Sequence, residues 1–111
     1  SWREGRIVSI PVPATIADGQ RTQAPGELTW PIVRALAAGI VTVSDDEIRA
    51  AMRFAFERLK LVVEPSGASA LAALLYGRVD VRGARVGVTI SGGNVDAAAF
   101  AACITSEFPL P

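Results

Sequence analysis

The sequence predicts an α/β protein in which helices cover a parallel sheet, and two observations support this fold class. Strand-like stretches alternate with helix-like stretches along the chain, in the order strand, helix, strand, helix, short strand, helix, strand, helix. Such alternation favours right-handed crossovers between parallel strands. Half of the 111 residues are hydrophobic but only 6% are aromatic, so small aliphatic side chains fill the core, as is typical of layered α/β proteins.

Four short stretches have the composition of buried strands, because most of their residues are β-branched or aliphatic. We predict strands at residues 7–10, 40–43, 61–63 and 86–90. The last stretch runs into Ser-Gly-Gly-Asn at 91–94, which predicts a tight turn into a helix. Ligands bind at the carboxyl ends of strands in open parallel sheets, so a cofactor would be within reach of the Ser91 hydroxyl. The alternative is that the two glycines only close an αβ layer.

The stretches between the strands carry signals of loops and helix ends. Pro11 and Pro13 stop the first strand, and residues 15–27 predict a long loop, which is either functional or a plain surface connection. Thr29 can cap a helix that stops at Gly39. A small-residue helix follows residues 64–67 and stops at Gly77, and the last helix is predicted at residues 95–104.

The second predicted helix has the clearest start signal. The Ser44 hydroxyl can accept a hydrogen bond from the Glu47 amide while the Glu47 carboxylate reaches back, which is a capping box. Capping and the helix dipole explain the acidic run at 44–47 better than a metal site does. Apolar residues at helical spacing predict a buried stripe on this helix: Ile48, Met52, Ala55, Phe56 and Leu59.

The charge balance excludes several classes of protein. Lys plus Arg and Asp plus Glu number eleven each, so no basic excess favours nucleic acid or an anionic membrane surface. No apolar run approaches the roughly twenty residues that a membrane span needs. We therefore expect a soluble, cytoplasmic protein. Because the chain opens abruptly and without Met, we also expect it to be a segment of a longer protein.

The absence of histidine limits the chemistry. Without His, the chain cannot build a His-based metal site or a Ser-His or Cys-His nucleophile. Cys103 is the single cysteine, so no internal disulfide forms. It lies in an apolar run and is predicted to be a small buried residue rather than a reactive thiol.

Five blocks of sequence together resemble one known family. They are TIADG at 15–19, PGELTWPIVR at 25–34, VTVSDDEI at 41–48, FERLKLVVEPSGASALAAL at 56–74 and TISGGNVD at 89–96. They are similar to the C-terminal part of the pyridoxal-phosphate-dependent serine/threonine dehydratases and serine racemases, which share the fold of the tryptophan synthase β subunit. The EPSGA form of the fourth block resembles the serine racemase and hydroxyaspartate dehydratase branch. The resemblance implies a partial doubly wound parallel sheet with flanking helices, a fragment of the large domain of such an enzyme.

The resemblance also implies a set of cofactor-binding residues. Ser91 would hydrogen-bond the pyridine nitrogen of pyridoxal 5'-phosphate, with Gly92 beside it and Gly19 against the ring. Glu64 would have a supporting role, as a polar contact or a proton relay. The plainer alternative for Glu64 is that its carboxylate only complements the positive end of the following helix.

Parts of the family's site have no counterpart in this sequence. In the family the lysine that carries the cofactor, the Gly-rich phosphate loop and any divalent-metal site lie upstream. The only lysine, Lys60, does not match that position, and a charge at a helix end explains it better. By resemblance, residues 1–111 are the C-terminal part of the catalytic domain, without a regulatory domain, and are inactive without the N-terminal remainder. The complete enzyme is expected to be a homodimer.

The function implied by the resemblance is a β-elimination. The complete enzyme would remove water from serine- or threonine-type hydroxy amino acids to give a 2-oxo acid and ammonia. A serine racemase-type isomerase is the alternative within the family. Two alternatives lie outside it: a non-catalytic α/β module that binds an anion at the turn at 91–94, and a structural piece whose exposed sheet edge pairs with another chain.

Overall fold

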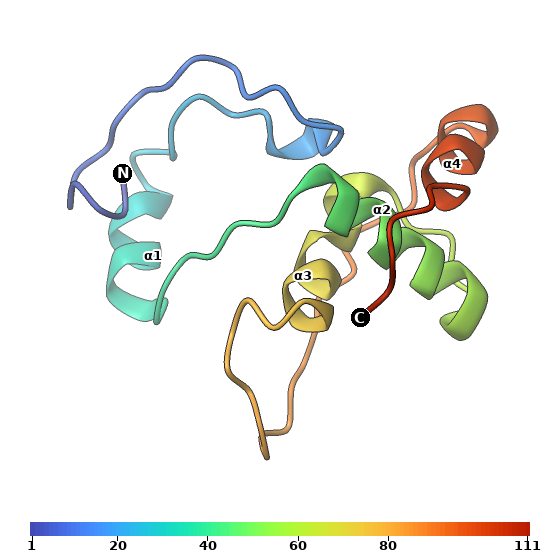
Figure 1. Cartoon of the computed structure of the whole chain (residues 1–111). Coiled ribbons are helices and arrows are strands. Elements are labelled where there is room, and N and C mark those ends of the chain that lie inside the picture. Colours follow the sequence, from blue (N-terminus) through green and yellow to red (C-terminus); the bar gives the residue numbers. More distant parts are fainter.

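The computed structural model describes all 111 residues and is built from short helices joined by long coil segments (Figure 1). The elements are the 3-10 turn η1 (Asp18–Gln20), α1 (Thr29–Leu36), α2 (Asp45–Phe54) with its π-helical continuation η2 (Ala55–Leu59), α3 (Pro65–Leu75) and α4 (Ala97–Ile104). Helix α2 packs against α3 and α4, and η1 packs against α3. None of the helices is long and apolar enough to cross a bilayer.

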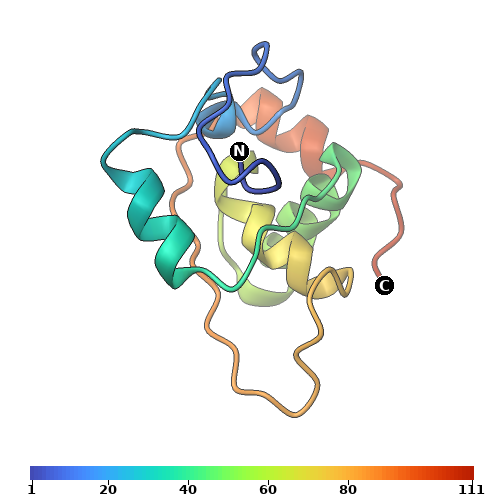
Figure 2. The same ribbon diagram turned by 90° about the vertical axis from the view of Figure 1, so that its left-hand side faces the viewer.

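The core lies between α2, α3 and α4 (Figures 1 and 2). Its buried members are small or aliphatic side chains without an aromatic ring, as the composition predicts: Ala17, Ile48, Ala51, Met52, Ala55, Val63, Ala68, Leu71, Ala72 and Cys103. Helix α1 stands apart from this group in both views and has no buried residue. The chain therefore has one small core and an arm outside it.

The predicted parallel sheet is not confirmed, because the structure contains no β-strand. No backbone hydrogen bond joins any two of the segments 7–10, 40–43, 61–63 and 86–90. A strand requires a neighbour that fills its ladder of donors and acceptors. The nearest approaches to a ladder are two single bonds, from the Ile10 N–H to the Gln23 carbonyl at 2.9 Å and from the Glu64 N–H to the Gly92 carbonyl at 3.1 Å. The four segments therefore remain coil, with apolar side chains such as Val41 and Val62 exposed.

The start of α2 confirms the predicted capping box. The Glu47 amide donates to the Ser44 hydroxyl at 3.2 Å, and the Ser44 amide donates to Glu47 Oε2 at 2.8 Å. The buried stripe is confirmed for Ile48, Met52 and Ala55. It is wrong for Phe56 and Leu59, which are exposed by 43% and 48%. These two residues lie in the π-helical turn, whose wider winding moves them off the stripe.

The predictions for the other helix ends are confirmed in part. Thr29 is the first residue of α1 rather than its cap, because its hydroxyl donates to the Gly26 carbonyl behind it and the helix has no side-chain cap. The same helix ends at Leu36, before Gly39, where the backbone of Ala37 becomes extended. Gly77 does follow α3, with a φ of +60°. Cys103 on α4 is buried, as predicted.

Candidate cofactor site at the start of helix α3

Three segments that are distant in sequence meet at the N-terminal end of α3. The Gly19 amide, from η1, donates to the Ser66 hydroxyl at 2.9 Å. The Glu64 amide, from the N-cap of α3, donates to the Gly92 carbonyl at 3.1 Å. Gly19, Glu64 and Gly92 therefore gather around one helix end, and Ser91 is the immediate neighbour of Gly92.

The segment 91–94 lies so close to α3 that side chains are excluded at the contact. A Cβ on Gly67 would lie 2.7 Å from the Gly92 carbonyl oxygen, and a Cβ on Gly93 would lie 2.5 Å from the Val62 carbonyl oxygen. A Cβ on Gly92 would lie 2.8 Å from Glu64 Oε1. Sequence reasoning assigned Gly92 to the approach of a planar ring. In the structure, packing against backbone by itself requires glycine at Gly67 and Gly93, whereas at Gly92 a movement of the Glu64 side chain would make room for a Cβ.

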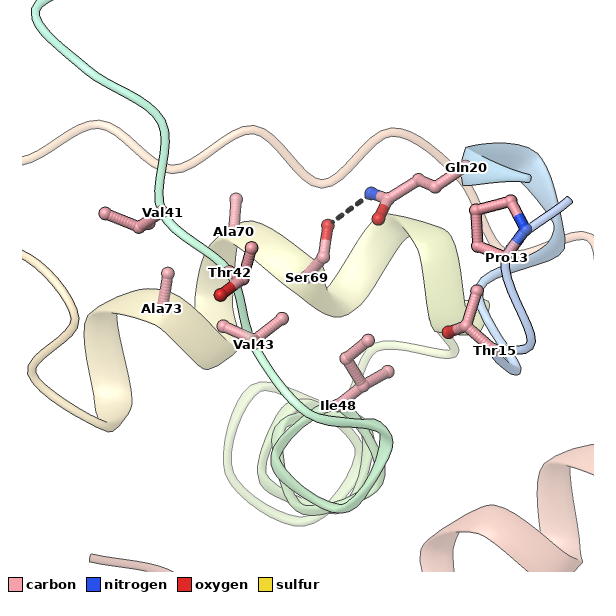
Figure 3. Close-up of a pocket in the computed structure, with 10 residues that line it drawn as sticks. All are labelled: Pro13, Thr15, Gln20, Val41, Thr42, Val43, Ile48, Ser69, Ala70 and Ala73. Atoms are coloured by element: carbon pink, nitrogen blue, oxygen red, sulfur yellow. Dashed lines mark hydrogen bonds between the residues drawn. The ribbon is translucent and has the colours of Figure 1, made fainter. Parts of the chain in front are cut away.

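The loop that carries Gly19 is held at both of its ends. At one end the Asp45 carboxylate accepts hydrogen bonds from the Thr15 hydroxyl at 2.5 Å and from the Ile16 amide at 3.1 Å. At the other end the Gln20 side chain donates to Ser69 Oγ at 2.7 Å (Figure 3). Sequence reasoning interpreted Asp45 only as a helix-end charge and did not single out Ser69, so it predicted neither of these contacts.

Two polar groups at this helix end have no hydrogen-bond partner within the chain. The Ser91 hydroxyl is on an exposed residue and neither donates nor accepts a bond within the chain, and the carboxylate of the half-buried Glu64 accepts none. A hydroxyl is both a donor and an acceptor, and a carboxylate is an acceptor. Together with a helix N-terminus and close-lying glycine backbone, these free groups fit one edge of a flat, polar cofactor such as pyridoxal phosphate.

The pockets beside this helix end do not include the predicted residues. One pocket of about 400 Å³ lies between segment 41–43 and α3, with Gln20 and Ser69 at one end (Figure 3). A second, also about 400 Å³, lies between η1 and the start of α4 and is lined by Asp18, Arg21 and Asn94 among others. Neither is lined by Gly19, Glu64, Ser91 or Gly92. The four predicted residues are therefore not enclosed in either of these pockets.

The single lysine of the chain has a structural partner away from the candidate site. The single lysine, Lys60, has a φ of +60° at the end of η2, and its ammonium donates to the Glu57 carbonyl at 2.8 Å. That contact confirms the prediction of a helix-end charge. No group of three or more acidic or cysteine side chains comes together in a way that would hold a metal ion.

Known proteins resemble this chain over most of its length. Residues 1–92 match the family described as "Pyridoxal-phosphate dependent enzyme". The L-threo-3-hydroxyaspartate ammonia-lyase of Pseudomonas sp. is 48% identical over 104 residues, which are 94% of this chain and 33% of that protein. The crystal structure of the T.th. threonine deaminase superposes with a TM-score of 0.72 at 46% identity, over 86% of this chain and 32% of that one. Maize serine racemase gives a TM-score of 0.81 at 42% identity, over 88% and 32%.

The comparison also shows what share of these relatives the chain represents. The chain spans about a third of the length of the relatives that it matches. Its likeness to them agrees with the α/β class predicted from the sequence, although the strands themselves are not formed here. The match over residues 1–92 and the identities above 40% show that this chain belongs to the family of pyridoxal-phosphate-dependent enzymes.

Proposed function

We propose that this chain is the C-terminal part of the catalytic domain of a pyridoxal-phosphate-dependent ammonia-lyase. The complete enzyme would remove water from serine- or threonine-type hydroxy amino acids and release a 2-oxo acid and ammonia. The observation that carries the proposal is the meeting of Gly19, Glu64 and Gly92 at the start of α3, in a chain of this family. The names of the relatives, which include L-threo-3-hydroxyaspartate ammonia-lyase and threonine deaminase, support the reaction class.

Ser91 is the proposed partner of the pyridine nitrogen. Its hydroxyl is exposed and has no partner in the chain, so it is available to a ligand. When bound, pyridoxal phosphate withdraws electrons from the α-carbon of an amino acid. A neutral hydroxyl does not hold the ring nitrogen protonated as an aspartate does. A weaker electron sink suits prompt loss of the β-hydroxyl after the α-proton leaves.

Glu64 and the two glycines are proposed to support the same site. The Glu64 carboxylate has no hydrogen-bond donor within the chain, so it is free for a polar contact or for relaying a proton. Gly19 and Gly92 present backbone without a Cβ, and a flat ring can approach such backbone closely.

The rest of the site is proposed to come from the N-terminal remainder. Lys60 does not match the family's lysine position, and its ammonium donates to a carbonyl of its own helix end, so we assign the cofactor lysine to the remainder. The phosphate loop, and a divalent-metal site if the enzyme has one, would lie upstream as well. The chain exposes 7553 Å² of surface, whereas a compact protein of this size exposes about 5,800 Å². The larger exposed surface supports the proposal that the N-terminal remainder covers part of this chain. We also propose that the complete enzyme is a cytoplasmic homodimer.

The racemase alternative rests on a specific observation. Maize serine racemase has the higher TM-score of the two solved structures, 0.81 against 0.72. A neutral partner for the ring nitrogen is compatible with both β-elimination and racemisation. The residues proposed for the site in this chain therefore do not distinguish an ammonia-lyase from a racemase. The non-catalytic module is the alternative from another class, and it predicts anion binding without turnover.

One experiment tests the whole proposal. The parent polypeptide is purified with pyridoxal phosphate and supplied with L-threo-3-hydroxyaspartate, L-serine or L-threonine, and 2-oxo acid, ammonia and D-serine are measured. We expect 2-oxo acid and ammonia from at least one substrate, and no product from the 111-residue chain alone. Accumulation of D-serine without 2-oxo acid would favour the racemase. Absence of cofactor absorbance in the parent, with phosphate bound at the amides of Gly92 and Gly93, would favour the binding module. Turnover by the isolated chain would contradict the proposed division of the site.

A further inference from the structure

The Ser66 hydroxyl joins helix α3 to the loop that carries Gly19. It accepts a hydrogen bond from the Gly19 amide at 2.9 Å and donates to Asp18 Oδ1 at 3.4 Å. A Cβ on Gly19 would lie 3.0 Å from Ser66 Oγ and 3.3 Å from Ser66 Cβ, so the two residues are already in close contact. The Gly19 amide has one other partner, Asp18 Oδ1 at 2.8 Å, which belongs to the same loop. Ser66 therefore gives this amide its link to α3.

A second serine extends the contact by one helical turn. Ser69 Oγ donates to the Ser66 carbonyl at 2.9 Å and accepts from Gln20 Nε2 at 2.7 Å (Figure 3). Gln20 Nε2 also lies 3.3 Å from the Ser66 carbonyl oxygen. The loop is thus held on α3 at two successive residues, Gly19 and Gln20, and the Gly19 contact is the one nearer to the helix N-terminus.

The first turn of α3 contacts both loops of the candidate site. Ser66 binds Gly19, and the next residue, Gly67, packs against the backbone of Gly92. Glu64, at the N-cap of the same turn, donates its amide to the Gly92 carbonyl. Because one rigid turn contacts both loops, the hydroxyl of Ser66 helps to set the separation of Gly19 from Glu64 and Gly92.

We propose that Ser66 is a positioning residue of the cofactor site, acting through the Gly19 amide. This inference rests on the proposed function, since it takes Gly19 and Gly92 as walls for the cofactor. Without the hydroxyl, the Gly19 amide keeps only its bond to Asp18, and the loop is free to move away from the helix. The separation of Gly19 from Glu64 and Gly92 is then no longer fixed before the cofactor binds, so cofactor binding has to order the loop and its affinity falls.

The test compares Ser66→Ala with Ser66→Thr, which keeps a hydroxyl, in the parent polypeptide. Thr105→Ala on α4 is the matched control, because it removes a hydroxyl that bonds only to the Ala101 carbonyl of its own helix. The readouts are hydrogen exchange of the Gly19 amide in the cofactor-free protein, the dissociation constant of pyridoxal phosphate from absorbance titration, and kcat and KM. Loss of one hydrogen bond predicts an exchange rate and a dissociation constant that are each about threefold to tenfold higher in Ser66→Ala. Ser66→Thr is expected to recover most of both, and Thr105→Ala to change neither.

The outcomes separate this inference from the proposed function. If the wild-type parent binds no pyridoxal phosphate, the proposed function fails, and the exchange rate of the Gly19 amide still reports whether Ser66 holds the loop. If the wild type binds the cofactor and Ser66→Ala matches it in exchange rate and in affinity, the role of Ser66 is wrong. A lower melting temperature with unchanged exchange and affinity would likewise overturn it, because Ser66 would then be only a structural residue.

Discussion

The start of α3 and helix α1 differ in how many hydrogen bonds and buried contacts they make with the rest of the chain. At the start of α3, backbone and side-chain hydrogen bonds tie three segments together, and the neighbouring Val63, Gly67 and Ala68 are buried. Helix α1 has no buried residue, and its apolar side chains Leu36 and Ile32 are exposed by 80% and 58%.

The difference indicates which parts of the structure are held in place by contacts within this chain. Close contacts and satisfied donors at the start of α3 set the relative positions of Gly19, Glu64 and Gly92 within the chain. Helix α1 instead contacts the N-terminal segment through its charged Arg34, whose guanidinium lies 4.7 Å from the centre of the Trp2 ring. We conclude that contacts within this chain position the residues at the start of α3, whereas no buried residue fixes the position of α1. Substitutions at the start of α3 and on α1 test this contrast, and one on the neighbouring helix α2 tests the ion pair beside the core.

Apart from the core comparison Leu71→Ser described below, the largest effect is expected at the contact between α3 and the segment 91–94. In Gly67→Ala the new Cβ would lie 2.7 Å from the Gly92 carbonyl oxygen and 3.2 Å from its amide nitrogen, so backbone has to shift. Helix propensity alone would favour Ala by about 1 kcal/mol. We expect the clash to win and to lower the free energy of unfolding of the parent polypeptide by about 1–3 kcal/mol, with weaker binding of pyridoxal phosphate.

The matched control for that substitution is Gly87→Ala, because a Cβ at Gly87 meets no atom within 4 Å. Denaturant unfolding and cofactor titration are measured for both variants. Equal stability and equal cofactor affinity in the two variants would mean that the segment 91–94 is not packed tightly on α3.

The next effect concerns the buried carboxylate of α2. Burial by itself would raise the pKa of Glu47, but hydrogen bonds from Ser44 and the ion pair with Arg78 outweigh it and lower the pKa below its usual value of 4.5. A lowered pKa in the folded state adds stability above pH 4.5, and that stability is lost as the pH falls through the folded pKa. Glu47→Gln is expected to lower the free energy of unfolding by about 1–3 kcal/mol at neutral pH, because Arg78 loses its charge partner.

The pH dependence distinguishes this ion pair from an exposed one. Denaturant unfolding of the parent polypeptide is compared for wild type and Glu47→Gln between neutral pH and about pH 3, below the usual carboxyl pKa. The difference between the two should shrink as the pH falls below 4.5. Asp46→Asn is the control, because its pair with Arg49 is exposed and is expected to contribute less than about 1 kcal/mol. A difference for Glu47→Gln that stays constant with pH would show that the charge of Glu47 is not what stabilises the fold.

What the sequence predicted correctly depends on short-range signals. The capping box joins residues only three apart, and the buried positions of Ile48, Met52 and Cys103 follow from local apolar patterns. Such interactions form within one or two turns of chain, so spacing alone reveals them. Phe56 was wrong because a π-helical turn changes the spacing that the pattern assumes.

What the sequence did not predict depends on partners far along the chain. The strands predicted at 40–43 and 86–90 need adjacent strands that pair with their backbone N–H and C=O groups. The periodicity of the sequence does not show whether such strands are present. The bond between Ser66 and Gly19 spans 47 positions, and the bond between Asp45 and Thr15 spans 30. Family resemblance led to Gly19, Glu64 and Gly92, but only the structure reveals the side chains that hold them together.

The smallest effect is expected on α1, where Leu36→Ser is compared with Leu71→Ser on α3. Leu36 is exposed by 80% and Leu71 by 7%. In the 111-residue chain, Leu36→Ser should change the free energy of unfolding by no more than about 0.5 kcal/mol, because no packing is lost. Leu71→Ser should cost about 2–5 kcal/mol, since it leaves a cavity in the core. Equal costs in denaturant unfolding would show that α1 packs on the core in solution and would remove the contrast between the two regions. A larger cost of Leu36→Ser in the parent than in the isolated chain would instead measure how far the remainder covers α1.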